Sequence, residues 1–152
     1  PPTKTDSFYY EFWKEFLDSF NLDDSNQPQP KIPTAQSLFS PLPPGGNSAW
    51  INTYFAGSSN EVGVYFKLGK GEFGEMAYKI LAEDETLLSE LPEGCQWEYS
   101  KGFHTIATTM HIDDITADSN RETIKSFFAQ NTNLFVNALR QRMANIAKSM
   151  KD

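Results

Sequence analysis

The sequence has little cysteine, little histidine and no long apolar run. Its single cysteine, Cys95, leaves no partner for an intrachain disulfide and no set of thiolates for a metal cluster. No stretch approaches the roughly 18 apolar residues of a membrane-spanning helix, and residues 1–6 contain no apolar signal core. These absences predict a cytoplasmic protein without membrane contact.

Basic residues are also scarce. The chain has 13 Lys and Arg residues against 20 Asp and Glu residues, which gives a formal net charge of -7. Because an acidic chain repels phosphate backbones, nucleic acid is not the expected partner. Four basic residues near the C-terminus leave one exception open, a local contact with DNA through Arg140, Arg142, Lys148 and Lys151.

A β-hairpin is predicted between Trp50 and Leu68. Strand 50–55 is followed by a turn at 56–60 that is rich in Gly, Ser and Asn. In strand 61–68 every second residue is apolar, namely Val62, Val64, Phe66 and Leu68. This period of two is typical of a half-buried strand.

An aromatic helix is predicted from Phe8 to about Asn21, with Asp6 and Ser7 as candidate caps. Its apolar residues cover an arc of roughly 200°, about twice what a helix packed on one side needs. Either the helix is buried on two sides within its own domain, or part of the arc meets another domain or subunit. The candidate contact residues are Tyr10, Trp13, Phe16 and Phe20.

Prolines and a Gly-Gly pair predict a long irregular connection over residues 23–48. Loops of this length in a compact domain are either functional or poorly ordered. Residues 1–6 are predicted to be a linker stub. We therefore expect one domain over residues 7–150, cut from a longer protein.

A second helix is predicted from Glu72 to Glu90, and Pro92-Glu93-Gly94 ends it. Strands 95–100 and 103–112 follow, joined by a tight turn. The predicted order is α-ββ-α-ββ-α, and the short turns force antiparallel pairing within each strand pair. We expect both pairs to join one four-stranded sheet in a two-layer α+β fold, with helices mostly on one face.

The last helix is predicted to begin after Ser119, which forms a capping-box pattern with Glu122, and to reach about Met150. Residues 131–133 are the expected place for a bend. Arg142 falls within the apolar stripe of this helix. Its guanidinium either reaches solvent where the stripe ends or pairs with an acid from a neighbouring element or a partner.

Few residues have a pattern that indicates chemistry. Residues 69–74 fit G-x-G-x-x-G, but no βαβ units follow, so a turn that leads into a helix is favoured over a dinucleotide site. His104 and His111 are seven apart in one strand and are expected on opposite faces. His111 with Asp113 and Asp114 is a candidate metal site, against the simpler interpretation of a solvated loop.

Several of these positions together resemble a known family. They are Phe12-Trp13, Trp50, Val62-Gly63-Val64-Tyr65-Phe66, Cys95-Gln96-Trp97-Glu98, Ile106 and the long closing helix. From about Phe8 to Met143 the chain is similar to the bacterial domain of unknown function family 4268. Members usually lie at the C-terminal end of proteins whose N-terminal parts often resemble restriction-type nucleases. The resemblance implies an accessory role in a nuclease-like or defence-related bacterial protein, and it supplies no catalytic residue.

The sequence therefore favours a non-catalytic interaction domain without a cofactor. Its expected partner is another domain of a longer parent chain or a second copy of itself. Two alternatives stay open. One is a small metal-dependent hydrolase or nuclease that uses His111, Asp113 and Asp114, and the other is a DNA-contacting domain.

Overall fold

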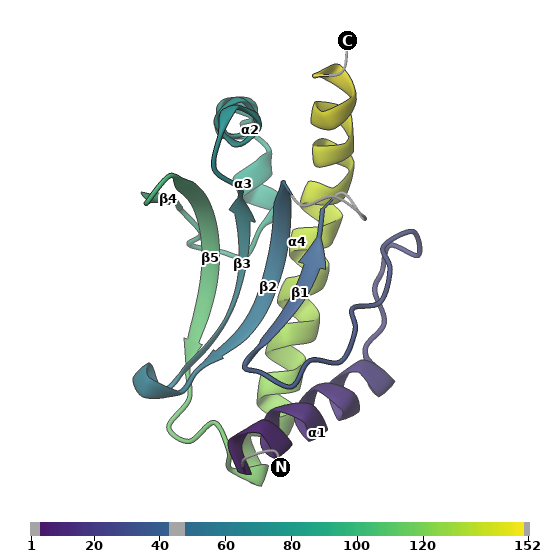
Figure 1. The fold of residues 1–152 in the computed structure, drawn as a ribbon, viewed down its shortest axis with the longest axis vertical. Coiled ribbons are helices and arrows are strands. Elements are labelled where there is room, and N and C mark those ends of the chain that lie inside the picture. Colours follow the sequence, from purple (N-terminus) through teal and green to yellow (C-terminus); the bar gives the residue numbers. More distant parts are fainter. Residues whose placement is uncertain (1–3, 43–47, 151–152) are drawn as a thin grey trace.

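The predicted hairpin is confirmed and lies in the middle of the sheet (Figure 1). Its strands are β2 (Ala49–Ala56) and β3 (Glu61–Leu68), which pair antiparallel. A 3₁₀ turn, η1 (Gly57–Ser59), and Asn60 connect them. Asn60 has a φ of 53°, a left-handed conformation that asparagine tolerates better than most residues.

The computed structural model describes residues 4–42 and 48–150. Besides the hairpin strands, its helices and strands in chain order are α1 (Lys4–Ser19), β1 (Ser37–Pro41), α2 (Glu72–Glu83), α3 (Leu87–Glu90), β4 (Trp97–Ser100), β5 (Phe103–His111) and α4 (Arg121–Ser149). The α+β class predicted from the sequence is confirmed.

The described part of the sheet has five strands, one more than predicted. Their order is β1-β2-β3-β5-β4, and every neighbouring pair is antiparallel. The additional strand, β1, lies inside segment 23–48, which was expected to be irregular; residues 43–47 of that segment lie outside the described residues. Pro41 is accommodated because it ends an edge strand, where no N–H is needed. The four-strand prediction is therefore wrong.

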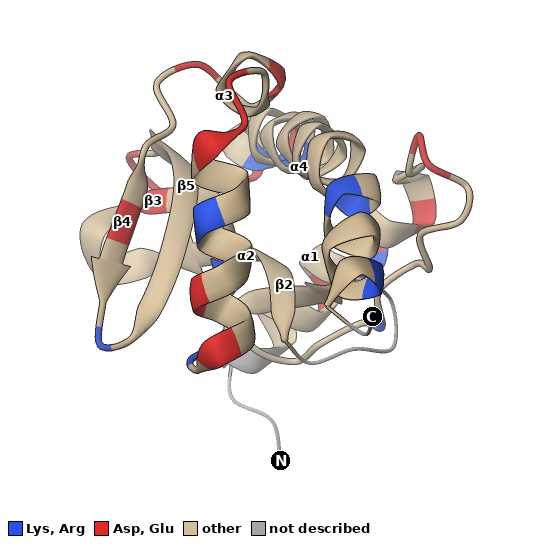
Figure 2. Ribbon diagram, turned by 90° about the horizontal axis from the view of Figure 1, so that it is seen from above, with Lys and Arg blue, Asp and Glu red and all other residues tan. Residues whose placement is uncertain are grey.

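The helices α1, α2 and α4 pack against one face of the sheet (Figures 1 and 2). Phe12 of α1 and Phe128 of α4 contact Phe55 of β2, with ring centroids 4.9 and 5.4 Å apart. Tyr78 of α2 stacks on His104 of β5 at 3.8 Å. The core lies between these helices and the apolar residues of alternate strand positions.

Two helix boundaries differ from the prediction. Residues 4–6, expected to be linker, already belong to α1, and residues 1–3 lie outside the described part of the chain. The helix predicted over 72–90 is broken at Asp84, whose carboxylate accepts hydrogen bonds from the amide and hydroxyl of Thr86 at 3.0 and 2.8 Å. Asp84 thus forms a local turn that competes with the helix.

The long last helix is present, but the predicted capping box is not. Ser119 lies in a 3₁₀ turn, η2 (Asp118–Asn120), and the Glu122 carboxylate contacts Lys125 at 2.7 Å. The helix α4 is continuous through residues 131–133, where a bend was expected. Neither α4 nor any other described helix is apolar enough over a sufficient length to span a membrane.

Candidate functional site

Three of the four aromatic residues predicted to contact a partner lie in the core of this domain. Trp13, Phe16 and Phe20 are 0%, 1% and 6% exposed. The indole Nε1 of Trp13 donates a hydrogen bond to the Ala35 carbonyl at 2.9 Å, so the loop after α1 covers one side of the aromatic arc. This corrects the prediction of an intermolecular contact for these three residues. Tyr10 alone among the four is largely accessible, at 42%.

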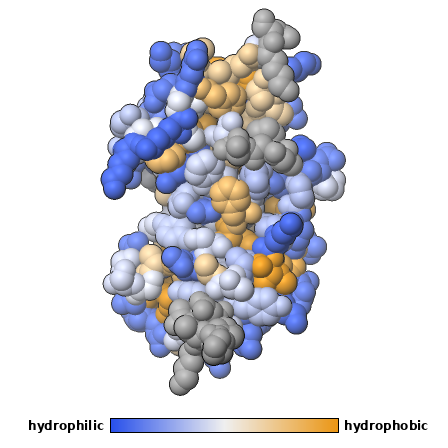
Figure 3. Space-filling view, in the orientation of Figure 1, coloured by the Kyte–Doolittle hydropathy of each residue, from blue (hydrophilic) through white to orange (hydrophobic). Residues whose placement is uncertain are grey.

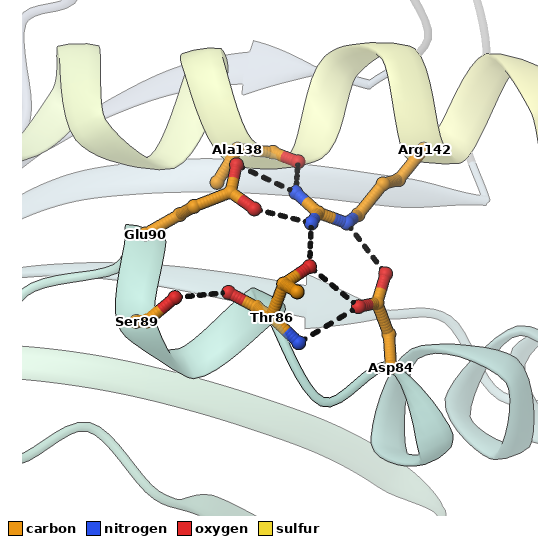
Figure 4. Close-up of polar contacts among 6 residues, drawn as sticks. All are labelled: Asp84, Thr86, Ser89, Glu90, Ala138 and Arg142. Atoms are coloured by element: carbon orange, nitrogen blue, oxygen red, sulfur yellow. Dashed lines mark hydrogen bonds and ion pairs between the residues drawn. The ribbon is translucent and has the colours of Figure 1, made fainter.

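Arg142 pairs with acids of its own chain (Figure 4). Its Nε donates to Asp84 at 2.8 Å, and its two terminal nitrogens donate to the two carboxylate oxygens of Glu90. It also donates to the Thr86 hydroxyl at 2.9 Å and to the Ala138 carbonyl at 2.6 Å. The alternative that Arg142 pairs with an acid from a neighbouring element is therefore correct. The alternative that its guanidinium reaches solvent is wrong. These contacts fasten α4 to the break between α2 and α3, and Arg142 is not free for a partner.

The Arg142→Met variant is expected to lose stability at neutral pH and to lose less of it in acid. Hydrogen bonds from Arg142 hold the pKa of Asp84 at about 2 and lower the pKa of Glu90. Because the pKa of Asp84 in the folded state lies below its ordinary value of 3.8, its contribution to stability is complete above that value and is lost as the pH falls towards 2.

Thermal unfolding of wild type and Arg142→Met across this pH range measures the effect. The difference between their unfolding midpoints should shrink as the pH falls from about 5 to about 2. Gln141→Met is the matched control, because Gln141 is an exposed neighbour on α4 that bonds only Asn145 among the described residues. If the difference in unfolding midpoint between wild type and Arg142→Met did not change with pH, the pairing of Arg142 with Asp84 and Glu90 would be contradicted.

The basic residues of the C-terminal segment have different surroundings. Arg140 forms an ion pair with Asp24 at 3.3 Å, and Arg142 is engaged as described. Lys148 is exposed, and Lys151 lies outside the described residues. Two of the four cations named for the alternative of a DNA contact thus form ion pairs with acids of the same chain.

The structure brings His111 and Asp113 together and directs Asp114 elsewhere. His111 Nε2 lies 3.2 Å from Asp113 Oδ1, and their side chains are 64% and 97% exposed. Asp114 accepts hydrogen bonds from the hydroxyl and amide of Thr116, which lower the pKa of Asp114. In residues 4–42 and 48–150, no three His, Cys, Asp or Glu side chains gather as metal ligands do. These residues form an exposed turn.

The two histidines lie on opposite faces of β5, as their spacing predicts. His104 is 8% exposed and its Nε2 lies 3.0 Å from Glu75 Oε1 of α2, while Tyr78 stacks on its ring. The contact joins α2 to the sheet. Sequence reasoning missed it because Glu75 and His104 are 29 residues apart.

The loop at residues 69–74 is a tight turn into α2. A Cβ on Gly74 would lie 2.0 Å from the Gly69 carbonyl oxygen, and Gly71 has a φ of 114°. The glycines therefore allow a close backbone approach and a left-handed residue. The preceding strand is antiparallel to both of its neighbours, unlike the parallel strand of a dinucleotide-binding unit.

The face of the sheet opposite the helices carries a cluster of aromatic side chains. We call it the open sheet face, and its aromatic residues are Phe39, Trp50, Tyr54, Tyr65 and Phe103. These positions alternate with core positions, and no described helix lies over the sheet in the view of Figure 1. Figure 3 shows the same side of the molecule, with hydrophobic patches among hydrophilic residues. Ring centroids lie 5.7 Å apart for Phe39 and Trp50, 6.4 Å for Trp50 and Phe103, and 5.5 Å for Tyr54 and Tyr65.

Neighbouring residues hold these rings in place. Tyr54 lies over Gly63, where an added Cβ would come within 2.5 Å of the ring. The Tyr65 hydroxyl accepts a hydrogen bond from Asn52 Nδ2 at 2.5 Å. Burial raises the pKa of Tyr54 above its ordinary value. An ordered surface of this kind loses little side-chain entropy on binding.

Two lysines lie at the end of the open sheet face that adjoins α2. The Nζ atoms of Lys67 and Lys70 are 4.7 and 5.1 Å from the centroid of the Phe103 ring, within cation–π range. A shallow pocket of about 360 Å³ opens there, lined by Ser48, Trp50, Gly69, Lys70, Phe73, Gly74 and Phe103. This end of the surface is aromatic and locally positive, in contrast to the net charge of the chain.

The open sheet face was not predicted as a site. Its signal is present in the sequence, because the outward positions of the hairpin include Trp50, Tyr54 and Tyr65 among polar residues. Alternation shows that a strand has two faces but not which of them the helices cover.

Comparisons of this chain with protein-family models, curated proteins and solved structures found no match.

Proposed function

We propose that this chain is a non-catalytic interaction domain whose open sheet face packs against another domain of a longer parent protein. One observation carries the proposal: five aromatic side chains gather on a sheet face that no described helix covers. Phe39 is 48% exposed within this surface. Trp, Tyr and Phe are enriched at protein interfaces, where buried aromatic anchors supply much of the binding energy.

The family resemblance indicates what type of protein the longer parent is. We expect a bacterial, cytoplasmic protein of the nuclease-like or defence-related type, in which this chain is the accessory part. The reacting groups would then belong to the rest of the parent. The paired titratable residues of this chain support this view, because His104 with Glu75 and Arg142 with Asp84 and Glu90 join helices to their neighbours.

A protein surface fits the open sheet face better than a nucleic acid does. Glu61 and Glu98 lie on the same face as Lys67, so a phosphate backbone would meet charges of both signs. The Phe103 ring is already in contact with two ammonium groups, which would compete with a stacked base. Mixed charge around an aromatic centre is the usual composition of a protein interface.

Radical footprinting tests the proposal. The polypeptide that contains this chain is isolated from its source cells and its intact mass is compared with 17.2 kDa, the mass of the chain alone. Side-chain oxidation is then measured in this polypeptide and in the isolated chain. Trp50, Tyr65 and Phe103 should be oxidised about fivefold more slowly in the native protein, because a second surface covers them.

Tyr99 is the internal control, because it is 63% exposed on the helix side of the sheet and should react equally in both samples. Equal rates at Trp50, Tyr65 and Phe103 would refute the proposal. Protection in a native protein of unchanged mass, together with a doubled mass in solution, would show that a second copy covers the face instead of another domain.

A further inference from the structure

The outer edge of β1 offers unpaired backbone groups. Leu42 and Gln36 flank this strand and bond to Ala49 and Phe55 of the β2 side, which fixes the even-numbered residues as those paired with β2. In an antiparallel ladder the alternate residues then point their N–H and C=O groups away from the neighbour. These residues are Ser37, Phe39 and Pro41, and Pro41 has no N–H.

This edge lacks one common form of protection, charged side chains, although Pro41 protects its last position. Natural edge strands commonly carry charged side chains that discourage pairing with another chain. The opposite edge strand, β4, has Glu98 and only four residues. In contrast, β1 has the uncharged sequence Ser-Leu-Phe-Ser-Pro. Among residues 4–42 and 48–150, no hydrogen bond occupies the outward backbone groups of Ser37 and Phe39.

Residues 27–33 lie beside β1 at the edge of the sheet (Figure 1). Side chains of both segments line a groove. Its volume is about 430 Å³, and its lining is mainly apolar, with Pro28, Pro30, Ile32, Pro33, Phe39 and Pro41. The far wall is held in place, because Gln29 Nε2 donates to the Leu17 carbonyl at 2.9 Å. A preformed groove avoids the entropy cost of ordering a loop on binding.

One buried polar atom in the groove has no partner. Gln27 is 5% exposed, and its Nε2 donates to the Pro41 carbonyl at 3.3 Å. Its Oε1 is buried and accepts no hydrogen bond from the described residues. A buried acceptor without a partner is costly. The Gln27 amide therefore occupies the outward carbonyl of Pro41, and its unpaired oxygen belongs to a residue that lines the groove beside Ser37 and Phe39.

We propose that the groove binds an extended segment of a different polypeptide, which adds to β1 as a sixth strand. Its backbone would pair with Ser37 and Phe39, and one of its N–H groups would reach Gln27 Oε1. Strand addition of this kind takes affinity from main-chain hydrogen bonds and specificity from alternate side chains. The groove lining contains Lys31 and no acid, so the segment should combine apolar residues with an acidic one. The groove shares only Phe39 with the open sheet face, and the proposed pairing uses the backbone of Phe39, so this inference does not rest on the function proposed for that face.

Amide hydrogen exchange with a selected peptide tests the proposal. A displayed library of random peptides of about 12 residues is selected on the immobilised chain, and an enriched peptide is synthesised. Without peptide, Ser37 and Phe39 amides should exchange rapidly, while those of Leu38 and Ser40 are slow through their pairing with β2. With peptide bound, the Ser37 and Phe39 amides should slow by about tenfold or more.

Two exposed isoleucines give a matched pair of variants. Ile32 in the groove is 40% exposed and Ile80 on α2 is 43% exposed, so both substitutions to Glu should leave the fold intact. Ile32→Glu should raise the Kd of the peptide about tenfold, since it places a negative charge against an acidic ligand. Ile80→Glu should leave the Kd unchanged.

Three results would overturn the proposal. The first is that the library yields no peptide that prefers wild type to Ile32→Glu. The second is that a selected peptide binds without slowing exchange at Ser37 and Phe39. The third is protection of these two amides in the free protein that grows with protein concentration, which would assign the groove to a second copy of this chain.

Discussion

The Trp13→Ala variant is expected to lose about 4 kcal/mol of unfolding free energy, the largest effect of any single substitution considered for this protein. Trp13 is 0% exposed, and its ring stacks on Phe128 with centroids 5.3 Å apart. Alanine would leave a cavity between α1 and α4 and would remove the indole donor from the Ala35 carbonyl. Denaturant unfolding followed by circular dichroism measures the loss.

Tyr10→Ala is the control for Trp13→Ala, because both residues belong to the aromatic arc of α1 but Tyr10 is 42% exposed. Its unfolding free energy should change by about 0.5 kcal/mol or less. Trp13→Phe should fall between the two, since it keeps an aromatic ring but leaves the Ala35 carbonyl unpaired, at a cost of about 1–3 kcal/mol. Equal effects of Trp13→Ala and Tyr10→Ala would contradict the buried position of Trp13.

Gly74→Ala is expected to destabilise the protein by about 3 kcal/mol, although the exchange of glycine for alanine within a helix ordinarily stabilises it. The added Cβ would lie 2.0 Å from the Gly69 carbonyl oxygen, which is backbone and cannot rotate away. The N-terminal turn of α2 would have to move off the end of β3. Thermal or denaturant unfolding gives the sign and the size of the change.

Ala82→Gly tests whether α2 otherwise follows helix propensity. Ala82 is exposed in the last turn of the same helix. Its substitution should cost about 0.5 kcal/mol, as expected for glycine in place of alanine. If Gly74→Ala proved more stable than wild type, the close approach of α2 to Gly69 would be wrong, and with it the packing of this turn.

Polar contacts show most clearly why part of the structure could not be predicted. The alternation in residues 61–68 placed β3 correctly, because neighbouring residues decide which face of a strand is apolar. The partners of Arg142 are Asp84 and Glu90, 58 and 52 residues away, and no local pattern links them. The break at Asp84 was missed for a different reason: the turn that Asp84 forms with Thr86 is local, but the apolar spacing of a helix continues across it.

The sequence by itself determined the hairpin, the presence of three helical segments, the α+β class and the opposite faces of His104 and His111, since each depends on periodicity over a few residues. Only the tertiary structure decided that β1 is a strand, because its hydrogen bonds come from β2 and its neighbouring prolines argue against a strand locally. It also decided that Trp13, Phe16 and Phe20 are core and that Phe39, Trp50, Tyr54, Tyr65 and Phe103 share an uncovered face. The packing of helices on one side of the sheet fixes both outcomes, and packing joins residues that are far apart in the chain.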